Sequence, residues 1–228
     1  YVKRILRLYP GLWVCFLFSI GLVSLSGYFI VTPVPLMEAI GWSIAQLTFF
    51  QFYNPDFLRS FGVGALNGAL WTIAVELQFY ALFPLIHRFL KSGLLTIGTV
   101  MVFFILLNIL NSNLSKTNLI EKLFNVSFLP WIYMFLTGAI IAHFSVLRTR
   151  ILQVGLAPAI LMFILTYLIS FYVGLSWGNN LNPMGFFLVA MVCFQIAFYH
   201  PSTADRLLSR NDISYGVYIY HMPVINFI

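Results

Sequence analysis

The sequence predicts an all-α protein, a polytopic bundle of transmembrane helices. The first observation is composition: of 228 residues, 61% are hydrophobic, 18% aromatic and only 8% charged, whereas soluble globular domains have roughly 25% charged residues. The second is mean hydropathy, which is +0.94. The third is that the apolar runs are long and unbroken, as in membrane helices, and lack the alternation of membrane β-strands.

Seven apolar segments approach or reach the length of about 20 residues that crosses a bilayer. In chain order they are Leu12–Val31, Ala65–Ile86, Leu94–Leu110, Phe128–Leu147, Ile151–Val173, Met184–Tyr199, and a last one from Ile213 onward. An eighth apolar stretch, Ala39–Phe52, is too short to span and contains Trp42, Gln46 and Gln51. We expect it to be re-entrant or interfacial.

The positions of the basic residues support this assignment. If Ala39–Phe52 does not cross, nine of the 12 lysines and arginines fall on one side of the membrane: Lys3, Arg4, Arg7, Arg88, Lys91, Arg148, Arg150, Arg206 and Arg210. The other side receives Arg59, Lys116 and Lys122. Because cytoplasmic loops are enriched in lysine and arginine, the side with nine is predicted to be cytoplasmic. The net charge of +6 therefore reflects topology, and no basic stripe with interleaved aromatics predicts a nucleic-acid partner.

Glu76 lies in the middle of Ala65–Ile86, which has no other charge. As a helix this stretch would extend roughly 33 Å, enough to cross a membrane. A carboxylate near the bilayer centre costs about 2.5 kcal/mol or more, so we expect Glu76 to face the protein interior and to have a function. The alternative is a structural carboxyl group bound by a neighbouring hydroxyl or amide. Trp71 lies further inside its segment than the other tryptophans and is predicted to line a pocket.

A basic segment immediately precedes the first predicted span. Arg4 and Arg7 are three residues apart, so on a helix they project from one face. Paired guanidinium groups suit phosphate oxygens, because each donates two hydrogen bonds and keeps its charge. The alternative is a basic flank that only sets the orientation of the first span.

The last segment combines hydroxyl groups with an imidazole. On a helix, Ser214, Tyr218 and His221 share one face at positions i, i+4 and i+7. Histidine is the usual general acid or base near neutral pH, which makes His221 a catalytic candidate. The alternative is a buried histidine bonded to backbone or to a tyrosine. Cys15 and Cys193 lie in apolar segments without a Cys-x-x-Cys pair or flanking ligands, so neither a disulfide nor a metal site is predicted.

Together, three segments resemble the acyltransferase 3 family of polytopic membrane O-acyltransferases. Arg4-Ile-Leu-Arg7 with Tyr9-Pro10 resembles its RRxxRIxPxY segment, Leu70–Tyr80 continuing to Phe83-Pro84 is similar to its WSLxVExQFYLxFP signature, and Ile213–Pro223 is similar to its iSYxlYLxHxP segment. The three occur in the family order with matching spans between them, and the resemblance covers essentially the whole chain.

The resemblance implies a single membrane acyltransferase domain over residues 1–228, part of a ten-span protein with two spans before Tyr1 and one after Ile228. It also implies a catalytic histidine in the first of those spans. None of the four histidines of this sequence matches that position, so we expect the fragment alone to be inactive.

The reaction implied by the resemblance is transfer of an acyl group, usually acetyl, from cytoplasmic acyl-CoA to a hydroxyl of a sugar or cell-surface glycan. Acyl-CoA (acetyl-CoA) is then the donor substrate rather than a bound cofactor, and the location is a bacterial inner membrane. O-antigen, exopolysaccharide, peptidoglycan, a lipid-linked sugar and a small glycoside all fit as acceptors. The residues implied to act are Arg4 and Arg7 on the CoA phosphates, Glu76 and His221 in catalysis, and Trp71, Tyr80, Ser214 and Tyr218 on the substrates.

Two other functions are compatible with a polar site inside a helical bundle. A transporter or flippase for a lipid-linked glycan would use the same interior for passage, and it predicts repeats and broken helices in paired positions. The sequence shows no internal repeat. The second alternative is an inactive scaffold subunit.

Overall fold

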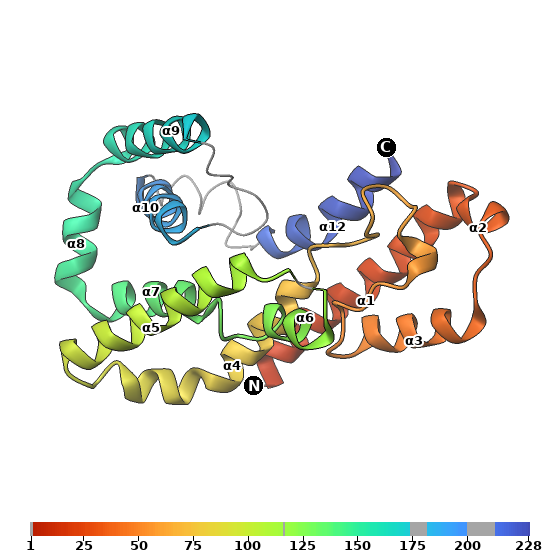
Figure 1. Cartoon of the computed structure of the whole chain (residues 1–228), viewed down its shortest axis with the longest axis horizontal. Helices are drawn as coiled ribbons and strands as arrows, with labels where there is room; N and C mark the ends of the chain where they lie inside the picture. Colours follow the sequence, from red (N-terminus) through yellow and green to blue (C-terminus); the bar gives the residue numbers. More distant parts are fainter. Residues whose placement is uncertain (1, 116, 174–181, 200–212) are drawn as a thin grey trace. The chain divides into compact units, whose positions relative to one another are not determined.

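A computed structural model describes residues 2–115, 117–173, 182–199 and 213–228, and in these ranges it contains helices and no strand (Figure 1). This agrees with the all-α prediction. The helices are α1 (Val2–Leu25), α2 (Tyr28–Val31), α3 (Leu36–Leu47), the 3₁₀ helix η1 (Asp56–Leu58), α4 (Trp71–Phe89), α5 (Leu94–Asn113), α6 (Leu119–Asn125), α7 (Ile132–His143), α8 (Ser145–Gln153), α9 (Leu156–Tyr172), α10 (Pro183–Tyr199) and α12 (Ser214–Phe227). Lys116, Arg206 and Arg210, used in the charge count, lie outside the described residues.

Two of the described helices, α1 and α5, are long and apolar enough to cross a membrane by themselves. The pair α7 and α8 would be a third span if taken together, although it is bent by 98°. Helices α9 and α10 are apolar but have only 17 residues each. These helices identify a membrane protein, whereas the count of seven spans stays a prediction.

Helix α1 begins at Val2 instead of Leu12, so it includes the basic segment. Arg4 and Arg7 therefore do lie on a helix. The predicted span Leu12–Val31 is interrupted at Gly27, whose φ of 74° lies in the left-handed region. That conformation costs about 1–2 kcal/mol for a residue with a side chain, and it separates α1 from the short α2.

The predicted span Ala65–Ile86 begins later than expected, because α4 starts at Trp71. Side chains of α12 donate to the preceding backbone carbonyls, of which that of Ala69 also accepts from the N–H of Thr72 at 3.3 Å. Asn226 Nδ2 donates to the carbonyls of Ala65 and Leu66 at 2.8 and 3.0 Å, and Tyr218 Oη donates to the carbonyl of Ala69 at 2.8 Å. These bonds hold the segment before α4 as an ordered loop.

The predicted span Phe128–Leu147 is also interrupted. Helix α7 ends at His143, and Phe144, with φ −96° and ψ 95°, adopts an extended conformation before α8 begins. The two helices meet at 98°.

The chain divides into two compact units. The first comprises Tyr1–Tyr80 and Asn211–Ile228, and the second comprises Ala81–Arg210, so α4 contributes residues to both. The prediction of a single domain stays a prediction beside this division. Every predicted site residue belongs to the first unit.

Within the first unit, α12 runs parallel to α1 and the start of α4 runs antiparallel to it. The Tyr215 hydroxyl donates to the carbonyl of Leu8 at 2.8 Å, and further along both helices the rings of Phe18 and Tyr220 lie 5.4 Å apart. The two helices therefore run in the same direction. Arg4, near the start of α1, lies at Tyr80, which is the last residue of α4 in the first unit. This part of α4 therefore runs antiparallel to α1.

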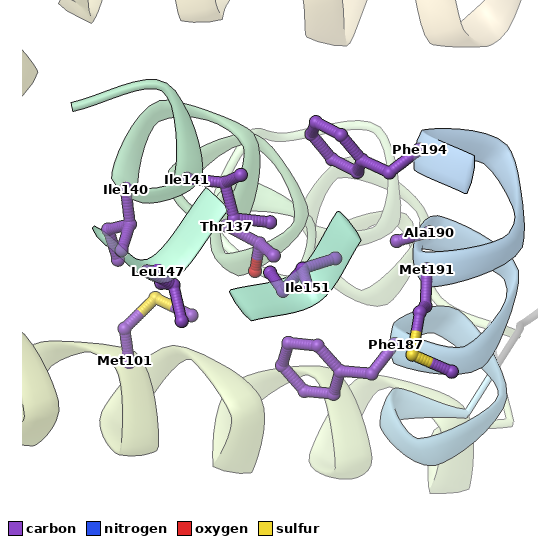
Figure 2. A pocket seen from close by; sticks show the side chains of 10 residues that line it. All are labelled: Met101, Thr137, Ile140, Ile141, Leu147, Ile151, Phe187, Ala190, Met191 and Phe194. Atoms are coloured by element: carbon purple, nitrogen blue, oxygen red, sulfur yellow. The ribbon is translucent and has the colours of Figure 1, made fainter. Parts of the chain in front are cut away.

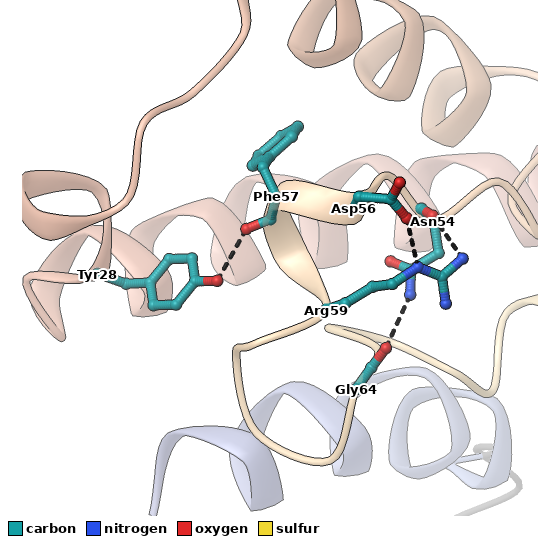
Figure 3. A network of polar contacts seen from close by, with 6 residues as sticks. All are labelled: Tyr28, Asn54, Asp56, Phe57, Arg59 and Gly64. Atoms are coloured by element: carbon teal, nitrogen blue, oxygen red, sulfur yellow. Dashed lines mark hydrogen bonds and ion pairs between the residues drawn. The ribbon is translucent and has the colours of Figure 1, made fainter.

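The stretch Ala39–Phe52, predicted to be re-entrant or interfacial, contains most of α3, which contacts α1. Trp13 Nε1 donates to the carbonyl of Leu47 at the end of α3, at 3.3 Å. The chain then returns to η1, where the Tyr28 hydroxyl donates to the carbonyl of Phe57 at 2.8 Å (Figure 3). The segment thus runs to the middle of α1 and returns to α2.

Polar contacts fix the end of this return. Arg59 Nε donates to Asp56 Oδ1 at 2.8 Å, and Arg59 Nη2 donates to the carbonyl of Asn54 at 3.3 Å. Asn54 Nδ2 in turn donates to the carbonyl of Gly64 at 3.2 Å (Figure 3). The ion pair is exposed, so it orders the loop and contributes little to stability.

Candidate functional site

The basic cluster of α1 and the carboxylate of α4 meet at Tyr80. The guanidinium carbon of Arg4 lies 5.1 Å from the centroid of the Tyr80 ring, within range of a cation–π interaction. The Tyr80 hydroxyl donates a hydrogen bond to Glu76 Oε1, one turn earlier on α4. Tyr80 therefore connects two clusters that the sequence placed more than 70 residues apart.

The basic cluster and the cluster around Glu76 differ in solvent exposure. Arg4 and Arg7 are exposed, whereas Glu76 and Tyr80 are partly buried. The guanidinium groups can therefore reach a ligand from solvent while the carboxylate stays inside. Glu76 has the hydroxyl partner that the structural alternative requires.

Tyr218 joins α12 to the start of α4. Its hydroxyl donates to the carbonyl of Ala69 and also contacts the Thr72 hydroxyl. Tyr218 is partly buried. Its position places the hydroxylic face of α12 against the segment that leads to Glu76.

The hydrogen bond of His221 defines its neutral tautomer. His221 Nδ1 lies 2.6 Å from the backbone carbonyl of Tyr218. A carbonyl oxygen can only accept, so Nδ1 carries a proton, and in the neutral imidazole Nε2 keeps a lone pair. This is the tautomer that a general base acting through Nε2 needs. The contact at Nδ1 is the backbone contact of the structural alternative, and the catalytic alternative for His221 stays a prediction.

The other two predicted residues lie at helix starts. Ser214 is the first residue of α12 and is exposed, on the same face as Tyr218 and His221. Trp71 is the first residue of α4 and is partly buried. Among the described contacts, Glu76 bonds to Tyr80 and His221 bonds to Tyr218, and no hydrogen bond joins Glu76 to His221.

Sequence analysis missed the residues that bind α12 to its neighbours. Cys15 is fully buried, and its Sγ donates to the carbonyl of Ile219 at 3.1 Å. Both cysteines were predicted to be small buried apolar residues, but Cys193 is exposed. Asn67 Nδ2 also donates to the carbonyl of Ile219, at 2.8 Å. A signal existed in Pro223, because a proline four residues later leaves a helical carbonyl without its N–H partner.

The second unit holds an apolar pocket of about 300 Å³ (Figure 2). Side chains of α5, α7, α8 and α10 line it, among them Met101, Ile141, Leu147, Phe187 and Phe194. Thr137 contributes a hydroxyl group to the lining, and this hydroxyl donates to the carbonyl of Tyr133 at 2.7 Å. The lining therefore offers hydrocarbon contacts and no group for acid–base chemistry. In the described part of the chain, no three His, Cys, Asp or Glu side chains are grouped to hold a metal ion.

The comparison with known proteins covers the whole chain. Residues 1–228 match the acyltransferase domain of the acyltransferase 3 family. The chain belongs to this family. As a family member it is similar to Nodulation protein 10 of Rhizobium leguminosarum bv. viciae, with 26% identity over 248 residues, covering 99% of this chain and 64% of the relative. The chain thus spans just under two thirds of that relative's length. No solved structure matches it.

Proposed function

We propose that the protein is a membrane-embedded O-acyltransferase, which transfers an acyl group, acetyl in the first instance, from acyl-CoA to a hydroxyl of a sugar or cell-surface glycan. The observation that carries the proposal is the connection of Arg4 through Tyr80 to Glu76. In this connection Arg4 is exposed and Glu76 is partly buried, which supports an outer group for binding an anion beside an inner carboxylate. Family membership supports the reaction class, and a rhizobial relative fits a bacterial inner membrane.

Arg4 and Arg7 are proposed to bind the phosphates of CoA. Both are exposed on one face of α1. They belong to the side predicted to be cytoplasmic, from which CoA would arrive. Guanidinium forks bind phosphate oxygens bidentately. The cation–π contact with Tyr80 would hold the Arg4 side chain in place before the donor binds.

Acyl transfer needs a base for the acceptor hydroxyl. As the acceptor oxygen attacks the thioester carbonyl, its proton passes to a histidine, and the tetrahedral intermediate then releases the CoA thiolate, which takes that proton. We propose Nε2 of His221 as a base, since its Nδ1 lies 2.6 Å from the carbonyl of Tyr218. The family resemblance implies a further histidine in the first span, whose orientation Glu76 would set. Trp71, Tyr80, Ser214 and Tyr218 are proposed to contact the substrates.

Incorporation of label from radioactive acetyl-CoA tests this function. Inverted membrane vesicles containing the complete protein should transfer labelled acetyl to a glycan fraction, and vesicles without it should not. Movement of a lipid-linked glycan across the membrane without acetyl incorporation would instead indicate a flippase. Absence of both activities would indicate a scaffold subunit.

A further inference from the structure

Pro223 creates a gap in the hydrogen bonding of α12. The proline lies inside the helix and has no N–H, so the carbonyl of Ile219, four residues earlier, has no helical donor. Ile219 is only 1% exposed, so water cannot replace the missing partner. A buried carbonyl left in this way destabilises the protein unless a side chain donates to it.

Two side chains from outside α12 donate to this carbonyl. Asn67 Nδ2 lies 2.8 Å from the Ile219 oxygen, and Cys15 Sγ lies 3.1 Å from it. Asn67 Nδ2 also lies 3.6 Å from Cys15 Sγ. The amide is the stronger of the two donors, because a thiol is a weak one.

The turn of α12 that contains Ile219 also carries the candidate site residues. Tyr218 precedes Ile219 directly, and His221 binds the Tyr218 carbonyl through Nδ1. A shift of this turn would move the Tyr218 hydroxyl away from Ala69 and would redirect the His221 ring. Proline allows such a shift, since it removes one bond that would otherwise keep the helix regular.

We propose that Asn67 is a positioning residue, whose amide completes the hydrogen bonding that Pro223 interrupts at Ile219 and thereby fixes the turn that carries Tyr218 and His221. The structural part of this proposal is independent of the reaction. The part that concerns activity rests on the proposed acyltransferase function.

A double-mutant cycle in the complete protein tests the structural part. Asn67→Leu keeps a similar side-chain size and removes the donor, and it should lower the melting temperature of detergent-purified protein by roughly 2–6 °C. Pro223→Ala returns a backbone N–H to the helix, so in that background Asn67→Leu should lower the melting temperature much less. Pro84→Ala is the matched control, because it removes another helix-interior proline, which interrupts the helical bond to the carbonyl of Tyr80 and not that of Ile219, and it should leave the cost of Asn67→Leu unchanged.

Each result of the cycle decides the structural part. Additive effects of Asn67→Leu and Pro223→Ala, or equal rescue by Pro84→Ala, would overturn it. If Asn67→Leu alone does not fold, recovery of folded protein in the Asn67→Leu/Pro223→Ala pair supports it. Failure of that pair, when Pro223→Ala alone folds, overturns it.

Kinetics test the positioning role. Asn67→Leu should lower kcat at least tenfold with little change in the KM for acetyl-CoA, and Pro223→Ala should restore part of that loss. An unchanged kcat in folded Asn67→Leu would overturn the positioning role. If the unmodified protein transfers no acetyl, the proposed function fails, and the melting temperatures still decide whether Asn67 caps Ile219.

Discussion

At the residue scale, the charge of Glu76 separates a catalytic from a structural carboxyl group. Glu76→Gln keeps the volume of the side chain and an acceptor for the Tyr80 hydroxyl, but removes the charge that would support a forming imidazolium. We expect folded, inserted protein whose acetyl transfer falls by about 10²-fold or more, the scale of general acid–base catalysis. The measurement is labelled acetyl transfer per molecule of inserted protein. Poor insertion with near-normal turnover would instead identify Glu76 as structural.

Also at the residue scale, Arg4→Lys and Arg7→Lys separate phosphate binding from topology. Lysine keeps the charge and hence the orientation of α1, but as a point charge it does not replace a bidentate fork. We expect a higher KM for acetyl-CoA in both variants, by about tenfold, which corresponds to roughly 1.4 kcal/mol of lost binding.

Lys3→Ala is the matched control for the arginine variants, because Lys3 is an exposed cation on the same first turn of α1. Its KM should stay close to the unmodified value. Wild-type kinetics in both lysine variants would leave only an orienting role for the arginines.

At the scale of elements, the loop before α4 depends on Gly62. Its φ is +62°, and a Cβ built there would lie 2.2 Å from Asn226 Oδ1, the atom that accepts from Val63 N at 3.1 Å. Gly62→Ala should therefore lower the free energy of unfolding by at least about 1–2 kcal/mol, the cost of a left-handed conformation for a residue with a side chain. We expect a melting temperature lower by roughly 2–8 °C.

Gly41→Ala provides the comparison for Gly62→Ala. Gly41 lies within α3, and a Cβ there would meet nothing within 4 Å, so alanine should hold or raise the melting temperature, since it favours helix over glycine. Equal behaviour of the two alanine variants would mean that Asn226 does not constrain the loop.

At the scale of the whole molecule, cysteine labelling tests the topology. Single cysteines introduced next to Arg88 and Arg148 should react with an impermeant reagent from the cytoplasmic side, and one next to Asn118 from the opposite side. The exposed Cys193 has to be replaced first, whereas the buried Cys15 can stay. Labelling of positions next to Lys3 and Arg88 from opposite sides would show that Ala39–Phe52 crosses the membrane.

The sequence alone determined the helical membrane class, the family and the candidate residues. Composition and the length of apolar runs are sums over many residues, so they remain informative when individual boundaries are wrong. The face shared by Ser214, Tyr218 and His221 also followed from the sequence, because helical periodicity alone fixes it. The physical cost of a charge in a bilayer likewise singled out Glu76 without coordinates.

Only the tertiary structure decided how these residues are connected. The start of α4 at Trp71 depends on Asn226 and Tyr218, which bind the preceding carbonyls from more than 140 residues away in sequence. No local pattern contains those donors, so hydropathy extended the helix too far. The donors to the Ile219 carbonyl have the same origin. A hydrogen bond between distant segments depends on how the chain folds in space, and the sequence shows only that a group such as the Ile219 carbonyl needs a partner.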